Sequence, residues 1–140
     1  MTQRTIAVKL KIPDNEAYTA LVALQRLGVA VSKVERAEIW QFDDEGLTPV
    51  EARFASNEML YNSNKHEMQV LDGGRPRTGE VWIEELDAAG VPLRMTGASH
   101  ARRYVAWRLY GPDKMSAASG VVREAAEKLL CNPAIERALQ

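Results

Sequence analysis

Apolar and polar side chains alternate along the start of the chain. In the stretch TIAVKLKI, residues 5–12, large apolar residues occupy every second position and smaller or charged residues lie between them. A period of two is typical of a strand with one buried and one solvated face. The pattern therefore predicts a first strand, which ends at Pro13 because proline has no N–H to donate.

A helical period follows this strand. Asp14 can cap the helix by accepting hydrogen bonds from its free N–H groups, and Gly28 lies where a left-handed residue is expected to end it. Apolar residues recur between them at three- and four-residue spacing: Ala17, Ala20 or Leu21, Leu24 and Leu27. We therefore predict an amphipathic helix with one buried stripe.

Residues 32–42 predict a second strand, although its apolar phase changes along the way. Ala37 and Ile39 share one phase, whereas Trp40 and Phe42 share the other. A change of phase by one residue indicates a bulge or a bend in the strand. Strand, helix and strand together make one β-α-β unit.

The texture of the chain changes between residues 43 and 100. The turn clusters DDEG, NSNK, DGGRPRTG and DAAG separate short β-favouring stretches, and helical periodicity is absent. The candidate strands are residues 59–61, 68–71, 81–86 and 91–95. We predict two hairpins here, of which VWIEEL-DAAG-VPLRM is the better defined. The segment 43–100 is thus predicted to be a β-rich insertion within a single domain of residues 1–140.

Alternation returns in RRYVAWRLYG, which predicts a further core strand. Its two faces carry Val105, Trp107 and Leu109 on one side and Tyr104, Arg108 and Tyr110 on the other. A Gly-Pro pair then breaks the strand. A last helix is predicted from residue 114 or 116 to Cys131, because apolar residues recur at helical spacing and Glu124 with Lys128 forms a favourable i,i+4 pair.

This last helix must end where proline follows. Asn132 precedes Pro133, and a residue before proline disfavours the α conformation. The sequence AIERALQ after the helix leaves two alternatives open, a short edge strand or an irregular tail. Two helices on one face of an antiparallel sheet give the ferredoxin-like layout. The predicted fold class is therefore α+β, a ferredoxin-like β-α-β-β-α-β antiparallel sheet with the segment 43–100 inserted.

Composition narrows the classes of protein that remain. The hydrophobic share of 46% and the charged share of 26% are ordinary for a globular protein. With a formal net charge of −1, no overall field would gather nucleic acid or anionic lipid. No apolar run approaches the roughly 18 residues of a membrane span, and the N-terminus lacks a signal-peptide pattern. The single cysteine, Cys131, cannot form an internal disulfide, so a cytoplasmic protein is expected.

Both ends of the chain resemble a known family. The stretch AEKLLCNPAIERALQ resembles the C-terminal region of PurS, the small subunit of bacterial and archaeal phosphoribosylformylglycinamidine synthase. The match is carried by Lys128, Leu129, Leu130, Asn132, Pro133, Ile135 and Glu136. At the front, VKLKIPD resembles the family's opening strand, and ALVALQRLGVAVSKVERAEIW resembles its helix and second strand. RRYVAWRLYG falls where its third strand is expected, while the insertion has no counterpart in the minimal subunit.

The resemblance implies a PurS-like fold and a scaffold function. Subunits of this family have no known catalytic residues, and no cofactor is expected. They lie between a glutaminase and a synthetase, help to hold them together for ammonia transfer, and associate with themselves. On this basis the chain is expected to be a non-catalytic homo-oligomer with glutaminase and synthetase subunits as partners.

No residue pattern in the sequence points to catalysis or metal binding. A zinc site needs three or four ligands, with cysteine or histidine pairs at short spacing, and His66, His100 and Cys131 are scattered. The histidines are expected on the surface. Cys131 is expected to be half-buried in the last turn of a helix, where the dipole disfavours thiolate. Glu84 and Glu85 are neighbours in a strand, so their carboxylates face opposite ways and cannot form an acid–base pair.

The loop DGGRPRTG, residues 72–79, is the strongest candidate for a ligand site. Its glycines permit close backbone approach, and Arg75 and Arg77 could pair bidentately with phosphate or carboxylate. The loop lacks the P-loop order of glycines followed by Lys-Ser/Thr, however, and no helix is predicted after it. A hairpin turn with solvated arginines is the favoured interpretation, and an anion site is the alternative.

Basic and aromatic residues mix on the strand RRYVAWRLYG. Such a mixture can bind single-stranded nucleic acid by stacking and phosphate contacts, but Trp107 shares the apolar face and is expected in the core. Tyr104, Arg108 and Tyr110 are predicted to form a protein interface, where tyrosine and arginine are enriched. No nucleic-acid or membrane partner is expected. An assembly protein is thus the leading hypothesis, a ferredoxin-like regulatory domain that binds a small ligand is the second, and a small enzyme using the insertion is the third.

Overall fold

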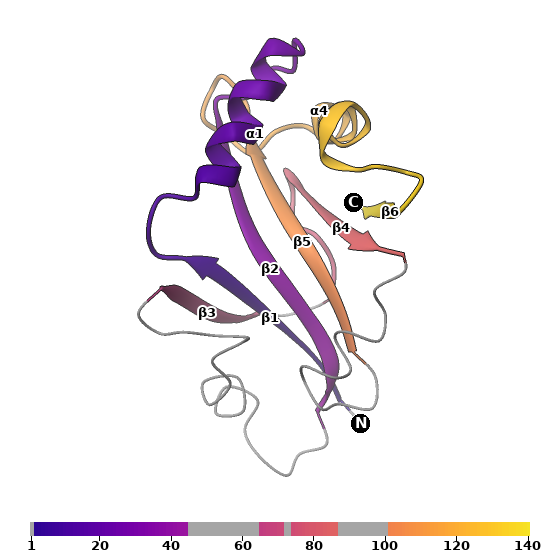
Figure 1. Ribbon diagram of the computed structural model, residues 1–140. Helices are drawn as coiled ribbons and strands as arrows, with labels where there is room; N and C mark the ends of the chain where they lie inside the picture. Colours follow the sequence, from indigo (N-terminus) through magenta and orange to yellow (C-terminus); the bar gives the residue numbers. More distant parts are fainter. Residues whose placement is uncertain (1, 45–64, 72–73, 87–100) are drawn as a thin grey trace. The chain divides into compact units, whose positions relative to one another are not determined.

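The computed structural model describes residues 2–44, 65–71, 74–86 and 101–140 (Figure 1). Within them the fold is α+β, with six strands hydrogen-bonded in the order β3-β1-β2-β5-β4-β6 and two helices. The elements are β1 (Thr2–Leu10), α1 (Asn15–Arg26), β2 (Lys33–Asp44), β3 (His66–Leu71), β4 (Glu80–Glu85), β5 (Ala101–Tyr110), α4 (Ser119–Ala125) with its π-helical extension η1 (Ala126–Leu130), and β6 (Glu136–Leu139). The prediction of an antiparallel α+β sheet with two helices is confirmed at this level.

The strand order differs in one respect from a simple β-α-β unit. Such a unit joins two parallel strands through its helix. Here β1 and β2 are joined by α1, yet they pair directly with each other and run antiparallel. The chain further divides into two compact units, and β2 and β5 contribute residues to both.

The first unit contains β1, β3 and the second half of β2. β1 pairs with β2 from Thr2↔Asp44 to Val8↔Glu38 without an interruption. Of the two predicted alternatives the bulge is therefore wrong, and the bend stays a prediction. The apolar phase of β2 changes because both of its faces are buried at this point: Ile39 and Trp40 are neighbours on opposite faces, and each is only 1% exposed. The change in apolar phase along β2 therefore reflects a strand that is buried on both faces.

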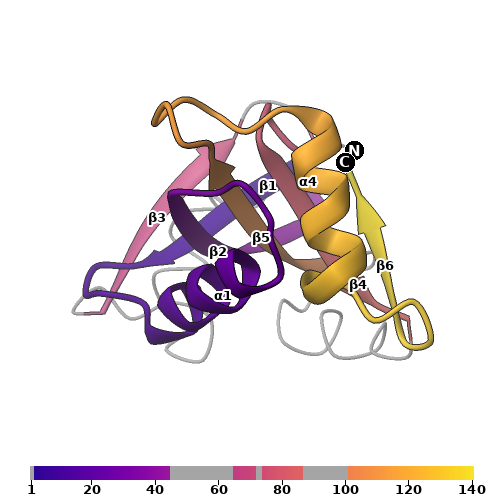
Figure 2. The same cartoon turned by 90° about the horizontal axis from the view of Figure 1, so that it is seen from above.

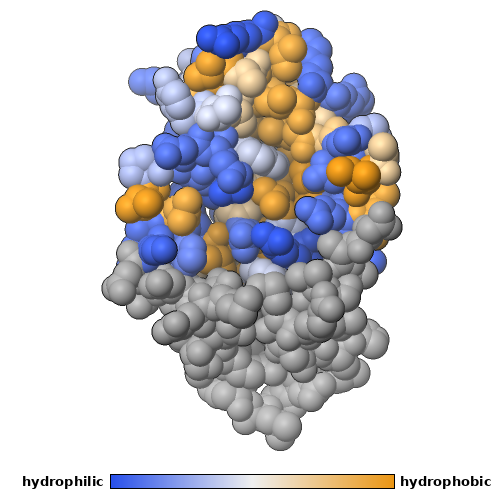
Figure 3. All heavy atoms as spheres, viewed as in Figure 1, coloured by the Kyte–Doolittle hydropathy of each residue, from blue (hydrophilic) through white to orange (hydrophobic). Residues whose placement is uncertain are grey.

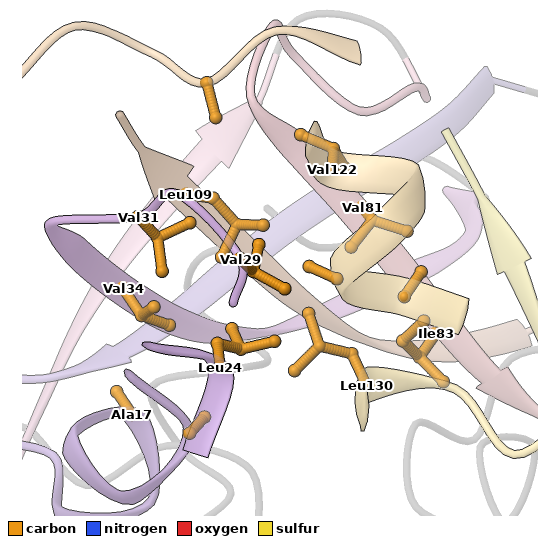
Figure 4. Packing of buried hydrophobic residues seen from close by; sticks show 14 residues of the cluster. Ala17, Leu24, Val29, Val31, Val34, Val81, Ile83, Leu109, Val122 and Leu130 are labelled. Carbon is orange, nitrogen blue, oxygen red and sulfur yellow. The ribbon is translucent and has the colours of Figure 1, made fainter. Parts of the chain in front are cut away.

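The second unit holds the larger described core. Figure 2 shows α1 and α4 lying together over β5 and β4, and Figure 4 shows their apolar side chains meeting those of the strands. The core consists of Ala17, Ala20, Leu24, Val29, Val31, Val34, Val81, Ile83, Leu109, Ala117, Val122, Ala125, Ala126 and Leu130. Burial of these apolar surfaces is the main force that holds the helices on the strands.

The ends of α1 follow the prediction. The Asp14 carboxylate accepts hydrogen bonds from the backbone N–H groups of Glu16 (3.0 Å) and Ala17 (3.2 Å), so the predicted N-cap is confirmed. Gly28 has φ +83° directly after the helix, as the predicted left-handed cap requires. Arg36 of β2 donates to the same Asp14 carboxylate at 3.1 Å, which ties the start of the helix to the strand that follows it.

The last helix is shorter at its start than predicted. It begins at Ser119, because the residues after Gly111 form a turn in which Lys114 has φ +66°. At its other end the helix widens, and the Cys131 N–H donates to the Ala126 carbonyl at 2.9 Å, an i→i+5 bond. Cys131 itself is extended and ends the helix as predicted. The residues beyond it form β6, so the edge-strand alternative is confirmed.

Part of the predicted insertion belongs to the core. β3 agrees with the candidate strand 68–71, and β4 agrees with 81–86. Val81 is 0% exposed and Ile83 is 4% exposed. β4 pairs with β5 along one edge and with β6 along the other. The candidate strands 59–61 and 91–95 lie outside the described residues.

Candidate functional site

One face of the strands in the second unit is polar. On β5, Arg108 and Tyr110 alternate with Leu109, whose side chain lies in the helix-side core. On β4, Glu80 and Trp82 alternate with the core residues Val81 and Ile83, so they lie on the face opposite the helices. We call this surface the polar strand face; its ionisable residues are Lys33, Glu35, Arg77, Glu80, Arg108 and Tyr110.

A buried carboxylate organises this face. The Glu80 side chain is only 4% exposed. Its Oε1 accepts hydrogen bonds from Trp82 Nε1 at 2.8 Å and from the Arg77 backbone N–H at 3.1 Å. Its Oε2 accepts from Arg77 Nη2 at 3.2 Å. Several donors and one positive charge thus compensate for the removal of this carboxylate from water.

Arg108 lies directly across from this carboxylate in the β4–β5 register, where it is the partner of Glu80. Its guanidinium carbon stands 5.5 Å from the ring centre of Tyr110. Its Nε is buried, and no hydrogen-bond partner for it lies among the residues that the structure describes. This Nε–H is therefore a donor that an acceptor from a bound molecule could satisfy.

Tyr110 is held in place from several sides. Its hydroxyl donates to Glu35 Oε1 at 2.5 Å, and Lys33 Nζ lies 5.4 Å from its ring centre. Burial and the hydrogen bond to Glu35 raise the pKa of the Tyr110 hydroxyl above its ordinary value of 10.0, whereas the charges of Arg108 and Arg77 act in the opposite direction. Tyr110 therefore stays protonated and acts as a fixed hydrogen-bond donor at neutral pH.

We predict that Tyr110→Phe removes this donor and changes the response to alkaline pH. At pH 7 the loss of one hydrogen bond to a carboxylate should lower the free energy of unfolding by about 1 kcal/mol. Because the pKa is raised in the folded state, the tyrosine contributes fully below pH 10 and loses its contribution as pH rises through the folded-state pKa. Urea unfolding at pH 7 and at alkaline pH should show the gap between the two proteins closing; a gap that widens would contradict the assignment.

The two arginines of the predicted ligand loop have different surroundings. Arg77 is 51% exposed and forms an ion pair with Glu80, so much of its charge is already neutralised within the chain. Arg75 is exposed, and it forms no ion pair among the residues that the structure describes. The loop ends at Gly79, whose φ is +81°. The residues around Arg77 therefore form a well-anchored turn. An anion bound at this loop would meet Arg75, which is exposed, and Arg77, which is already paired with Glu80.

The three predicted interface residues do not share one environment. Tyr104 is 3% exposed, so the prediction that it lies in an exposed interface is corrected: its side chain is buried within the chain. Arg108 and Tyr110 are both half-buried. The structure brings these two together with Arg77, which the sequence offered as a separate feature.

Three participants were not found by sequence reasoning: Lys33, Glu35 and Glu80. Lys33 and Glu35 belong to the first part of β2, whose pairing partners cannot be read from local pattern. Glu80 did leave a local signal, because Arg77 and Glu80 stand three residues apart on either side of a glycine and Trp82 follows two residues later. A carboxylate directly before an apolar strand, beside an indole donor, is a usable sign of a buried acceptor.

The other candidates remain structural. His66 is half-buried in β3, and His100 lies outside the described residues. Burial and the nearby Glu136 raise the pKa of the half-buried Cys131 thiol, which opposes thiolate formation. Glu84 forms an ion pair with Arg137 at 2.7 Å. Within the described part of the chain, no three histidine, cysteine, aspartate or glutamate residues are grouped to hold a metal ion.

No protein-family model matches the sequence, and no curated protein shows significant similarity to it. Among the described residues, no helix has the length and apolar character that crossing a membrane requires.

Proposed function

We propose that this chain is a non-catalytic assembly protein of the cytoplasm that acts through its surfaces, in the manner of the PurS subunit that bridges a glutaminase and a synthetase in purine biosynthesis. In this proposal it associates with itself and binds these two subunits. We also propose that the fold is ferredoxin-like, because both helices pack on one face of the strands. The observation that carries the proposal is the polar strand face with Arg108 and Tyr110 at its centre.

The composition of this face suits a protein partner. Arginine and tyrosine are the residues that most often dominate binding energy at protein interfaces. Positive side chains (Lys33, Arg77, Arg108) alternate there with the carboxylates of Glu35 and Glu80. A surface for phosphate or nucleic acid is expected to be predominantly basic. A mixed pattern instead favours a partner with its own mixed charges.

The rigidity of the face also favours binding. Tyr110 is fixed by its hydrogen bond to Glu35, and Arg108 lies over its ring. Side chains that are ordered before binding lose less entropy when a partner arrives. The buried Nε of Arg108 supplies a donor that a partner could satisfy after a small rotation of the side chain. These features support an anchor site centred on the two residues.

The motif that carries the family resemblance has a structural role. Lys128 Nζ donates to the Leu27 carbonyl at the end of α1 (3.3 Å). The Asn132 N–H donates to Glu136 Oε1 (2.9 Å), and the Glu136 N–H donates to the Asn132 carbonyl (2.8 Å). These bonds close the turn from η1 into β6. The resemblance therefore supports a shared helix–turn–strand junction, and the choice of partner rests on the polar strand face.

The test is binding to purified glutaminase and synthetase subunits from the same organism. We expect both to co-purify with the chain, and Arg108→Ala to weaken the association by about tenfold or more, as for an interface anchor. Arg123→Ala is the matched control, because Arg123 is an exposed arginine of α4 on the opposite side of the strands, and it should bind as the unaltered protein does. Circular dichroism of both variants separates loss of binding from loss of folding. Absence of any association with either subunit would refute the proposal.

A further inference from the structure

β6 is an edge strand with apolar residues around it. It pairs on one side with β4, from Trp82↔Leu139 to Glu85↔Glu136, and among the described residues no strand pairs with its other side. Leu86, Ile135 and Leu139 beside this edge are 49%, 54% and 40% exposed. Figure 3 shows apolar atoms at the surface where Figure 1 labels β6. An edge of this kind can accept another strand.

The direction of each backbone group on β6 follows from one hydrogen bond. The Leu86 N–H donates to the Ile135 carbonyl at 2.8 Å, so Ile135 faces β4 with its backbone groups. In an antiparallel ladder the hydrogen-bonded residues alternate. Arg137 and Leu139 therefore also face β4, whereas Ala138 and Gln140 direct their backbone groups away from it.

Glu136 also directs its backbone groups away from β4, but one of these two groups is already hydrogen-bonded. Its N–H donates to the Asn132 carbonyl at 2.8 Å, which leaves its carbonyl open. The outward groups are thus the Glu136 carbonyl, the Ala138 N–H and carbonyl, and the Gln140 N–H. This set is self-complementary about Ala138: each donor on one side has an acceptor at the same distance on the other.

We infer that a second copy of the chain pairs its own β6 with this edge, antiparallel, about a two-fold axis at Ala138. In this register the two Ala138 residues exchange N–H···O=C bonds, and the Gln140 N–H of each copy donates to the Glu136 carbonyl of the other. This pairing would be the contact through which the chain associates with itself, and the inference rests on the self-association in the proposed function. It uses the strand edge and leaves the polar strand face to other partners.

The registers with the two-fold axis at Glu136 or at Arg137 are excluded by charge and by direction. A two-fold axis perpendicular to the sheet keeps each side chain on its own face. Because side chains alternate between the faces, opposed residues must differ by an even number of positions, so the axis must pass beside one residue and not between two. An axis at Glu136 sets two carboxylates opposite each other and needs an N–H that is already bonded. An axis at Arg137 sets two guanidinium groups opposite each other, which is destabilising. At Ala138, each Arg137 lies opposite a Leu139 and each Glu136 opposite a Gln140, so no like charges oppose each other.

Cysteine cross-linking tests the register. In a Cys131→Ser background, which removes the single native cysteine, Ala138→Cys places two thiols on directly opposed residues with Cα atoms about 5.5 Å apart, within disulfide range. We expect most of this variant to become a covalent dimer under mild oxidation. Leu139→Cys is the matched control, since its two copies would lie diagonally, about 7–8 Å apart, and should remain largely monomeric on a non-reducing gel. Equal cross-linking of both, or of neither, would overturn the register.

A proline at the same position tests the contact without oxidation. Ala138→Pro removes only an outward N–H, which an edge strand tolerates, whereas Ala138→Val keeps it. Sedimentation should show the dimer dissociation constant raised by about tenfold or more for proline, because each dimer loses two hydrogen bonds, and little changed for valine. An unchanged mass for the proline variant, or a monomeric parent protein, would overturn the inference. Retained binding of the proline variant to glutaminase or synthetase would show that self-pairing and partner binding are separate, so that either can fail alone.

Discussion

Gly79→Ala is expected to destabilise the protein by about 3 kcal/mol or more. The left-handed backbone at φ +81° costs a non-glycine residue about 1–2 kcal/mol. A Cβ at this position would also lie 2.9 Å from the Leu109 carbonyl oxygen, 3.0 Å from Ser116 Cβ and 3.1 Å from the Ala117 nitrogen. Two of these atoms are backbone and cannot move away independently. The Gly79 carbonyl accepts from the Leu109 N–H at 2.7 Å, so relief of the clash would also strain this bond.

Gly28→Ala provides the matched control. Gly28 has a similar φ of +83°, but no atom lies within 4 Å of the position that its Cβ would take. Only the conformational cost remains, so the loss should be about 1 kcal/mol. Urea unfolding followed by tryptophan fluorescence measures both variants. Equal losses at the two positions would show that the loop before β4 does not pack as described.

The second large effect is expected at Glu80. Glu80→Ala should lower the free energy of unfolding by about 3 kcal/mol, because two N–H donors lose their acceptor and each unsatisfied buried donor costs about 1–3 kcal/mol. Both the Trp82 Nε1–H and the Arg77 backbone N–H lose their acceptor, and Trp82 is 0% exposed, so water cannot easily replace it. Urea unfolding of the variant and of the unaltered protein at neutral pH measures this difference.

Two further variants define the cause of this effect. Glu80→Gln keeps one carbonyl acceptor and should retain part of the stability. Glu85→Ala changes an exposed glutamate at the end of the same strand, and a surface change of this kind normally lies within about 0.5 kcal/mol of zero. If Glu80→Ala were as mild as Glu85→Ala, the carboxylate would not be the organising group of the polar strand face.

Local chemistry was enough to predict the elements near the N-terminus. Asp14 and Gly28 mark the two ends of α1 because capping depends on residues within one turn of each helix end. The same reasoning placed the end of the last helix before Pro133. It failed at β2, where Ile39 and Trp40 are buried on opposite faces, because a strand that is covered on both sides shows no clean alternation.

Long-range pairing was beyond the sequence. VWIEEL was correctly predicted as a strand, but nothing local indicates that β4 lies between β5 and β6. The candidate site shows the same limit: Arg77, Arg108 and Tyr110 were identified singly, while Glu35 and Glu80, which fix them, required the register of three strands. Tyr104 was misplaced because strand alternation gives the face of a residue and not what covers that face.

The position of β4 between β5 and β6 has a consequence for how the protein is made. The second unit draws its residues from 14–36, 75–86 and 105–140, and β4 has one neighbour, β6, that begins only at Glu136. A growing chain on the ribosome therefore cannot complete this unit until the residues of β6, up to Leu139, have been translated. Until then, Val81 of β4 and the apolar stripe of α1 have no finished core to enter, and closure of such distant segments is slow. Protection by chaperones during synthesis would matter more for this chain than for a helical bundle of the same length.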